Sequence, residues 1–274
     1  MSEITRFAPS PTGLLHPGHA FSALLADTMS KDGGCFLLRI EDIDHMRYQD
    51  TYVESIFHDL AWLGLSWPKP VWYQSHRMAL YEHALNHLRE REVLYPCFCT
   101  RSGLMQASAR APHALPRATY NGTCRVLSPR DTRTKLQMGT PYALRLDTSK
   151  ALDQTGPLSW SDTLHGCFSV DASVLGDVIL ARKDIGTSYH LSVVVDDAAQ
   201  NVSLVTRGED LLPTTHTHRL LQALLNLPTP RYMHHRLIMD AHGARYAKRD
   251  TSTTLRSLRQ QGMTPQDVRH HLGV

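Results

Sequence analysis

Apolar residues in the first 94 positions alternate between short continuous runs and longer stretches with helical spacing. The short runs predict strands at residues 3–8, 35–40 ("CFLLRI") and 71–75 ("VWYQS"). The helical stretches predict helices at residues 17–31, from Tyr52 to Leu63, and across 76–92. This repeated order of strand and helix indicates a parallel sheet covered by helices on both faces.

Residues 95 to about 165 interrupt this alternation with clustered cysteines, scattered prolines and many polar residues. Apolar runs resume at 178–184 ("VILARKD"), 191–212 and 235–240 ("HRLIMD"), with a helix expected from Thr214 to Leu225. The sequence therefore predicts an α/β fold, a doubly wound parallel sheet split by an insertion. We predict four segments: the first half of the catalytic domain at 1–94, the insertion at 95–165, the second half at 166–240, and a loop with a helical tail at 241–274.

Composition narrows the protein class only slightly. Hydrophobic residues make up 42% of the chain and charged residues 20%, values that are ordinary for a globular protein. The formal net charge of +3 is compatible with binding to nucleic acid but does not require it. No apolar run reaches the roughly 18 residues of a membrane span, and no secretory signal precedes the first strand. We therefore expect a cytoplasmic protein that does not interact with a membrane. The odd number of cysteines, five, argues against a disulfide framework.

Loops that follow the predicted strands carry the candidate chemistry. In doubly wound sheets, ligands bind beyond the carboxyl ends of the strands. The first such loop, "RFAPSPTGLLHPGH" at residues 6–19, leads into a helix whose N-terminus suits phosphate. Gly18 permits close approach to the backbone, and His16 and His19 can donate to phosphate oxygens. A rigid turn with two capping histidines is the alternative explanation.

Two sequence stretches add a family resemblance. "PSPTGLLHPGH" resembles the first signature, His-Ile-Gly-His, of class I aminoacyl-tRNA synthetases. "RFAPSPTG" followed by "RIEDID" resembles the glutamyl branch specifically. The resemblance implies a Rossmann-like catalytic domain that activates L-glutamate with ATP and Mg²⁺.

A glutamate site needs cationic groups for two carboxylates and an anion for the ammonium. Arg6 and Arg207 can hold carboxylates, and Glu41 can hold the ammonium. A surface ion pair is the better explanation for each residue alone, but a weaker one for the set. The resemblance implies that glutamate is bound by Arg6, Phe7, Ala8, Pro9, Ser10, Glu41, Tyr189 and Arg207. It implies that ATP is bound by His16, Gly18, His19 and Lys248, with His16, His19 and Lys248 as the catalytic residues.

The second family signature, Lys-Met-Ser-Lys-Ser, corresponds here to "RYAKR" at 245–249. Lys248 retains the lysine expected to stabilise charge on the phosphates of ATP. Arg245 replaces the first lysine and Ala247 the serine, so the loop keeps its charge but loses a hydroxyl group.

Three of the cysteines lie close together in the predicted insertion. Cys97, Cys99 and Cys124 offer three thiolates, and structural zinc requires a fourth ligand. His113, Tyr120 and His165 are all candidates on chemical grounds. The spacing "CFC" followed by "YNGTC" resembles a short branch of the glutamyl family in which tyrosine completes the site. We therefore expect one structural Zn²⁺ bound by Cys97, Cys99, Tyr120 and Cys124, the alternative being three ordinary reduced cysteines.

The chain ends soon after Lys248, whereas a full glutamyl-tRNA synthetase continues into a helical anticodon-binding region. The resemblance is therefore to the short branch, which lacks this C-terminal domain and transfers glutamate to the queuosine base in the anticodon of tRNA(Asp). Two alternatives remain open. One is a shortened synthetase that charges the 3′ end of tRNA, and the other is a non-catalytic paralogue that binds glutamate or RNA.

Overall fold

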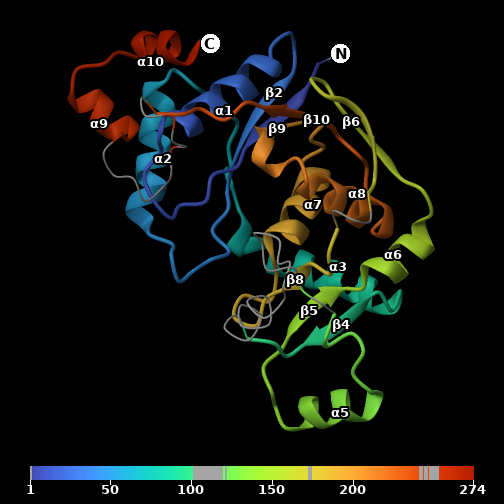
Figure 1. Cartoon of the computed structure of the whole chain (residues 1–274). Coiled ribbons are helices and arrows are strands. Elements are labelled where there is room, and N and C mark those ends of the chain that lie inside the picture. The colour runs from blue at the N-terminus through green and yellow to red at the C-terminus, as the bar shows by residue number, and fades with distance from the viewer. Residues whose placement is uncertain are drawn as a thin grey trace.

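The computed structural model describes residues 2–100, 120, 122–171, 175–240, 243, 246 and 253–274 (Figure 1). Its strands are β1 (Ile4–Phe7), β2 (Cys35–Ile40), β3 (Trp72–Tyr73), β4 (Leu94–Cys97), β5 (Ala143–Leu146), β6 (Ser159–Asp162), β7 (Gly166–Ser169), β8 (Ile179–Ala181), β9 (Leu204–Gly208) and β10 (Arg231–His235). Its helices are α1 (Pro17–Met29), α2 (Asp50–Trp62), α3 (Met78–Glu90), α5 (Pro129–Gln137), α6 (Thr148–Thr155), α7 (Tyr189–Ala199), α8 (Thr214–Leu224), α9 (Leu255–Gln260) and α10 (Pro265–Leu272). None of these helices is long and apolar enough to cross a membrane.

Parallel strands form the central layer of the fold. β1, β2 and β3 pair in parallel, and β10 pairs in parallel with both β9 and β6, while β7 adds an antiparallel edge. β9 lies beside β1, where the amide of Ser203 donates to the carbonyl of Ile4 (2.9 Å). The layer thus runs β3-β2-β1-β9-β10-β6-β7, and the direction of winding reverses between β1 and β9, as in doubly wound folds. The predicted fold class is confirmed.

A second, antiparallel sheet of β4, β5 and β8 lies at the opposite end of the molecule, with α5 beyond it (Figure 1). β8 comes from the run "VILARKD", which carries no information about whether its partner lies in the parallel or the antiparallel sheet. β6 lies before residue 165, yet it pairs with β10 in the parallel layer. The four predicted segment boundaries stay predictions.

One strand lies earlier in the chain than its sequence pattern indicated. The apolar run at 235–240 predicts the last strand, but β10 ends at His235, where that run begins. β10 includes His234, a buried histidine whose ring forms hydrogen bonds with Asp162 and Arg207. A strand whose buried side chains are polar has no apolar run, so the hydrophobic pattern did not predict β10 at its observed position.

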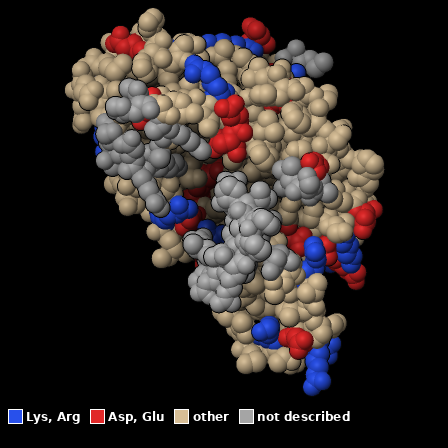
Figure 2. Space-filling view, viewed as in Figure 1, with Lys and Arg blue, Asp and Glu red and all other residues tan. Residues whose placement is uncertain are grey.

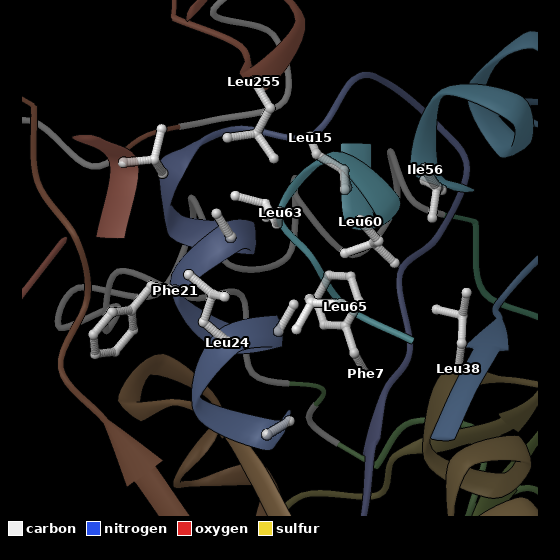
Figure 3. Close-up of a cluster of buried hydrophobic side chains, with 14 of the residues drawn as sticks. Phe7, Leu15, Phe21, Leu24, Leu38, Ile56, Leu60, Leu63, Leu65 and Leu255 are labelled. Carbon is white, nitrogen blue, oxygen red and sulfur yellow. The ribbon is translucent and has the colours of Figure 1, made fainter. Parts of the chain in front are cut away.

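The largest apolar cluster packs α1 and α2 against β1 and β2. Figure 3 shows Leu24 of α1, Leu60 of α2, Leu63 directly after α2 and Phe7 of β1 pointing into a common centre. Leu255 from α9 contributes to the same cluster, and its amide donates to the carbonyl of Leu15 in the opening loop (2.8 Å). The C-terminal helices therefore support the loop that lies at the carboxyl end of β1.

Gly34, in the turn between α1 and β2, is a point at which backbone approaches backbone. A Cβ there would lie 2.1 Å from the carbonyl oxygen of Glu3 and 2.5 Å from that of Ser30. Gly34→Ala should lower the free energy of unfolding by about 1–3 kcal/mol, the usual range for overpacking. Urea unfolding measures this, with Gly176→Ala as the control because nothing lies within 4 Å of its Cβ position. Equal stability of the two variants would contradict the expected clash.

Candidate active site

The opening loop places two histidines at the first turn of α1. His16 precedes Pro17, the first helical residue, and its backbone amide donates to Nδ1 of His19 (3.2 Å). The two rings stack with their centroids 3.7 Å apart. A Cβ on Gly18 would lie 3.1 Å from the His16 ring, so glycine lets the histidines lie this close. His19 thus caps the helix end, and both histidines also line a cavity.

The cavity has a volume of about 280 Å³ and lies at the carboxyl ends of β1, β2 and β9, at the reversal point of the sheet. Figure 2 shows a hollow near the middle of the viewed face, with acidic and basic side chains visible inside it. From the sequence prediction, the residues that line the cavity are Arg6, Phe7, Ala8, Pro9, Ser10, His16, Gly18, His19, Glu41, Tyr189 and Arg207. Lys248, together with Arg245 and Ala247, lies outside the described residues.

The predicted site residues leave out part of the lining. These further residues are Ser22, Thr206, Gly208, Asp210, Leu211, His235, Leu237, Ile238 and Tyr246. Ser22 stands one helical turn after His19, a spacing that could have indicated it. Residues 208–211 directly follow Arg207 at the end of β9, where a ligand edge was expected. His235 offered no such signal, because the last strand was expected to begin there rather than end.

A buried network of charges fixes Arg6 and Glu41. Arg6 Nε pairs with Asp197 Oδ1 (3.1 Å), which also accepts from Arg39 Nη1 (2.8 Å). Arg39 is fully buried and reaches Glu41 Oε1 at 3.5 Å. Burial raises the pKa of Glu41, although the neighbouring arginines Arg39 and Arg6 oppose this effect. Arg6 is therefore partly neutralised before any ligand arrives.

Asp196, the neighbour of Asp197 on α7, ties the same network to α3. Its carboxylate accepts hydrogen bonds from Arg77 Nε (2.6 Å), Tyr81 OH (2.8 Å) and Gln74 Nε2 (3.0 Å). The sequence predictions did not include Asp196 and Asp197. The signal that could have indicated buried charges with partners is the acidic pair in the otherwise apolar "VVVDD".

Arg207 lies in a different environment. Its Nε donates to Nε2 of His234 (3.0 Å), its Nη2 to Oγ1 of Thr215 (2.6 Å), and its Nη1 to both Nδ1 of His218 (3.1 Å) and the hydroxyl of Tyr189 (3.3 Å). His234 in turn bonds through Nδ1 to Asp162 (2.7 Å). Burial and the Arg207 cation lower the pKa of His234 to about 4 and that of His218 well below its usual range.

The three cysteines of the insertion converge on one point. The sulfur atoms of Cys97, Cys99 and Cys124 all lie within 4.8 Å of one another, and those of Cys99 and Cys124 are 3.5 Å apart. Tetrahedral zinc–thiolate bonds of about 2.3 Å give sulfur separations of about 3.8 Å, so these thiols fit a metal ion. Burial opposes thiolate formation at Cys97, but hydrogen bonds from Arg145, the backbone of Cys99 and Tyr120, together with the charge of Arg145, lower the pKa of that thiol.

The candidates for a fourth ligand differ in position. Tyr120 lies at the cluster, where its hydroxyl accepts from the amide of Cys124 (2.7 Å). His165 instead bonds to Asp162 (2.9 Å) in the turn between β6 and β7, and it is not among the described residues that could share a metal with the three cysteines. His113 lies outside the described residues.

Comparison with known proteins assigns the class of this fold and site. The profile of the family described as "tRNA synthetases class I (E and Q), catalytic domain" matches residues 4–273. The chain therefore belongs to this family of class I synthetases.

Individual relatives specify the branch. A Glutamyl-Q tRNA(Asp) synthetase from Rhodobacter capsulatus is 45% identical over 282 residues, which cover 99% of this chain and 100% of the relative. Another from Nocardia farcinica is 42% identical, covering 96% of this chain and 81% of the relative. A solved glutamate-tRNA synthetase from Elizabethkingia anophelis has a TM-score of 0.78 at 29% identity, covering 91% of this chain and 53% of the other. The resemblance to the short branch is confirmed.

The low pKa of His234 predicts a pH dependence of stability. An unfolded histidine binds a proton below about pH 6.5, whereas His234 in the folded protein stays neutral down to about pH 4. The unfolded state is therefore favoured as the pH falls through this window, by about 1.4 kcal/mol per pH unit for this residue. His234→Gln should flatten the fall in unfolding free energy measured by urea titration between pH 6.5 and 4. His83→Gln, on the exposed side of α3, controls for the substitution itself, and parallel profiles for wild type and His234→Gln would contradict the assignment.

Proposed function

We propose that the protein activates L-glutamate with ATP and transfers the glutamyl group to queuosine in the anticodon of tRNA(Asp). The observation that carries the proposal is the match of nearly the whole chain to a Glutamyl-Q tRNA(Asp) synthetase at 45% identity. The cavity supports it, since two buried arginines, Arg6 and Arg207, and one buried acid, Glu41, line the same space. These charges complement the two carboxylates and the ammonium of glutamate.

In the first step, an oxygen of the α-carboxylate of glutamate attacks the α-phosphorus of ATP and displaces pyrophosphate. The protein supplies no covalent nucleophile, because alignment and charge stabilisation are sufficient for this reaction. Glu41 orients the ammonium, and Arg6, Ser10, Tyr189 and Arg207 hold the rest of the amino acid. His16, His19 and the first turn of α1 bind the phosphates, and Lys248 stabilises the charge that develops on them. Mg²⁺ bound to ATP supplies further neutralisation of the phosphates.

In the second step, a hydroxyl of the cyclopentene diol of queuosine attacks the activated carbonyl carbon and releases AMP. The acceptor lies in the anticodon loop, so that the loop itself enters the cavity that holds the adenylate. An acceptor at the tRNA 3′ end gives the same first step, and only the second step distinguishes the two functions.

Zn²⁺ bound by Cys97, Cys99, Tyr120 and Cys124 is the metal proposed for the cysteine cluster. Cys97 ends β4, and Cys124 lies in the segment that leads to α5, so a shared ion connects the two. A closed site of four protein ligands serves structure rather than catalysis.

The decisive experiment incubates the protein with tRNA(Asp), ATP and radiolabelled glutamate, then identifies the anticodon nucleosides by mass spectrometry. We expect a glutamylated queuosine, and no labelling of tRNA that lacks queuosine. Prior periodate treatment should abolish labelling by oxidising the diol. Labelling of a free 3′ end without queuosine would instead establish a shortened glutamyl-tRNA synthetase, and absence of glutamate-dependent pyrophosphate exchange would establish a non-catalytic paralogue.

The metal proposal predicts that Cys99→Ser loses zinc. Replacing one thiolate removes a strong ligand, and metal binding is coupled to the order of its surroundings. Elemental analysis of the purified protein should show about one zinc per chain in the wild type and clearly less in Cys99→Ser. Cys167→Ser is the matched control, because Cys167 lies exposed on β7 away from the cluster. A wild-type protein without zinc would refute the site.

A further inference from the structure

Arg207 differs from the other arginines of the cavity network in the charge of its partners. Arg6 pairs with Asp197, and Arg39 pairs with Glu41, Asp196 and Asp197. Arg207 is only 5% exposed, yet in the part of the chain that the structure describes no carboxylate forms an ion pair with it. Its hydrogen bonds end on two imidazoles and two hydroxyls.

The guanidinium group dictates how these imidazoles carry their protons. Arginine only donates hydrogen bonds, so Nδ1 of His218 and Nε2 of His234 must both be acceptors without a proton. Each ring then carries its proton on the other nitrogen. His218 donates from Nε2 to Nδ1 of His190 (3.2 Å), and His234 donates from Nδ1 to Asp162 Oδ2 (2.7 Å). One chain of hydrogen bonds therefore fixes both tautomers.

Asp162 and His190, the partners of the two imidazoles on the side away from Arg207, stabilise these neutral tautomers. Asp162 is buried and also accepts from the amides of His234 (3.0 Å) and Leu164 (2.9 Å). Burial raises the pKa of Asp162, but these two amides and the side chains of His234 and His165 together hold it below its usual range. Its charge is thus satisfied without contacting Arg207. Burial and the nearby Arg207 lower the pKa of His190 to about 4, so it too remains neutral.

A buried cation held only by neutral groups keeps its charge available to a ligand. Acceptors orient the guanidinium without cancelling its field, whereas a carboxylate partner would do both. Arg207 and Tyr189 both line the cavity, so the uncompensated charge faces the ligand space. A ligand carboxylate there gains a charge-assisted pair, while an uncharged amide leaves the cation unpaired.

We propose that His218 and His234 are positioning residues that hold Arg207 with neutral acceptors and thereby make the cavity select a carboxylate over the corresponding amide. The inference rests on the proposed activation of glutamate, and it assigns the rejection of glutamine to the groups behind Arg207 as well as to the arginine itself.

Two substitutions of His218 separate charge from shape. Asparagine and aspartate are nearly isosteric, and each places an oxygen acceptor near the position of the histidine Nδ1. Aspartate adds one negative charge that pairs with Arg207, whereas asparagine does not. In amino-acid-dependent exchange between pyrophosphate and ATP, His218→Asp should lower the glutamate-over-glutamine ratio of kcat/KM by about 10-fold or more, mainly through a higher KM for glutamate. His218→Asn should retain most of the ratio.

Two results of this comparison would overturn the inference. One is a His218→Asp variant whose selectivity equals that of the wild type. The other is a His218→Asn variant that loses as much selectivity as His218→Asp, because His218 would then act only through its shape.

A second measurement uses the wild-type protein alone and requires neither glutamate nor a substitution. Nuclear magnetic resonance of the wild-type protein with ¹⁵N-labelled histidine reports the protonation of each ring nitrogen. At pH 7 we expect both rings neutral, with the proton on Nε2 of His218 and on Nδ1 of His234. A charged ring or the opposite tautomer at either position overturns the inference. Failure of the wild type to catalyse exchange counts against the proposed function alone, since the tautomers are read independently of it.

Discussion

The architecture of the site depends on the buried pair of carboxylates near the end of α7. Asp197 binds Arg6 of β1 and Arg39 of β2, and Asp196 binds Arg77 at the start of α3. Buried charges are tolerated only when they are paired and hydrogen-bonded, and this network connects β1, β2, α7 and the start of α3. The same contacts set the charge of the cavity, because they neutralise Arg6 in part and leave Glu41 beside Arg39.

The two arginines that face the ligand space are consequently unequal. Arg6 shares its charge with Asp197, whereas Arg207 keeps its own. An amino acid with an ammonium and two carboxylates meets one acid, one compensated cation and one uncompensated cation. This asymmetry lets a small cavity distinguish groups of similar shape by their charge, since an imperfectly paired buried charge is strongly unfavourable.

Local patterns predicted most of the elements and the edge of the sheet where the cavity lies. Residues 9–19 and Glu41 follow predicted strands directly, so strand direction alone placed them together. The pairing of β8 with β5 was not predictable, because an apolar run of this length carries no information about its partner. The role of Asp196 and Asp197 was missed for a related reason: their partners, Arg6, Arg39 and Arg77, lie more than 100 residues away in sequence. Long-range pairing of buried charges has no periodic signature.

The junction between β1 and β9 has a consequence for synthesis of the chain. Arg6 and Asp197 are separated by 191 positions, and the backbone hydrogen bond between Ser203 and Ile4 joins residues a similar distance apart in the sequence. A nascent chain emerging from the ribosome therefore carries the opening loop and α1 long before the groups that complete their surroundings exist. The contact between Arg6 and Asp197 can therefore form only after residue 197 has been synthesised.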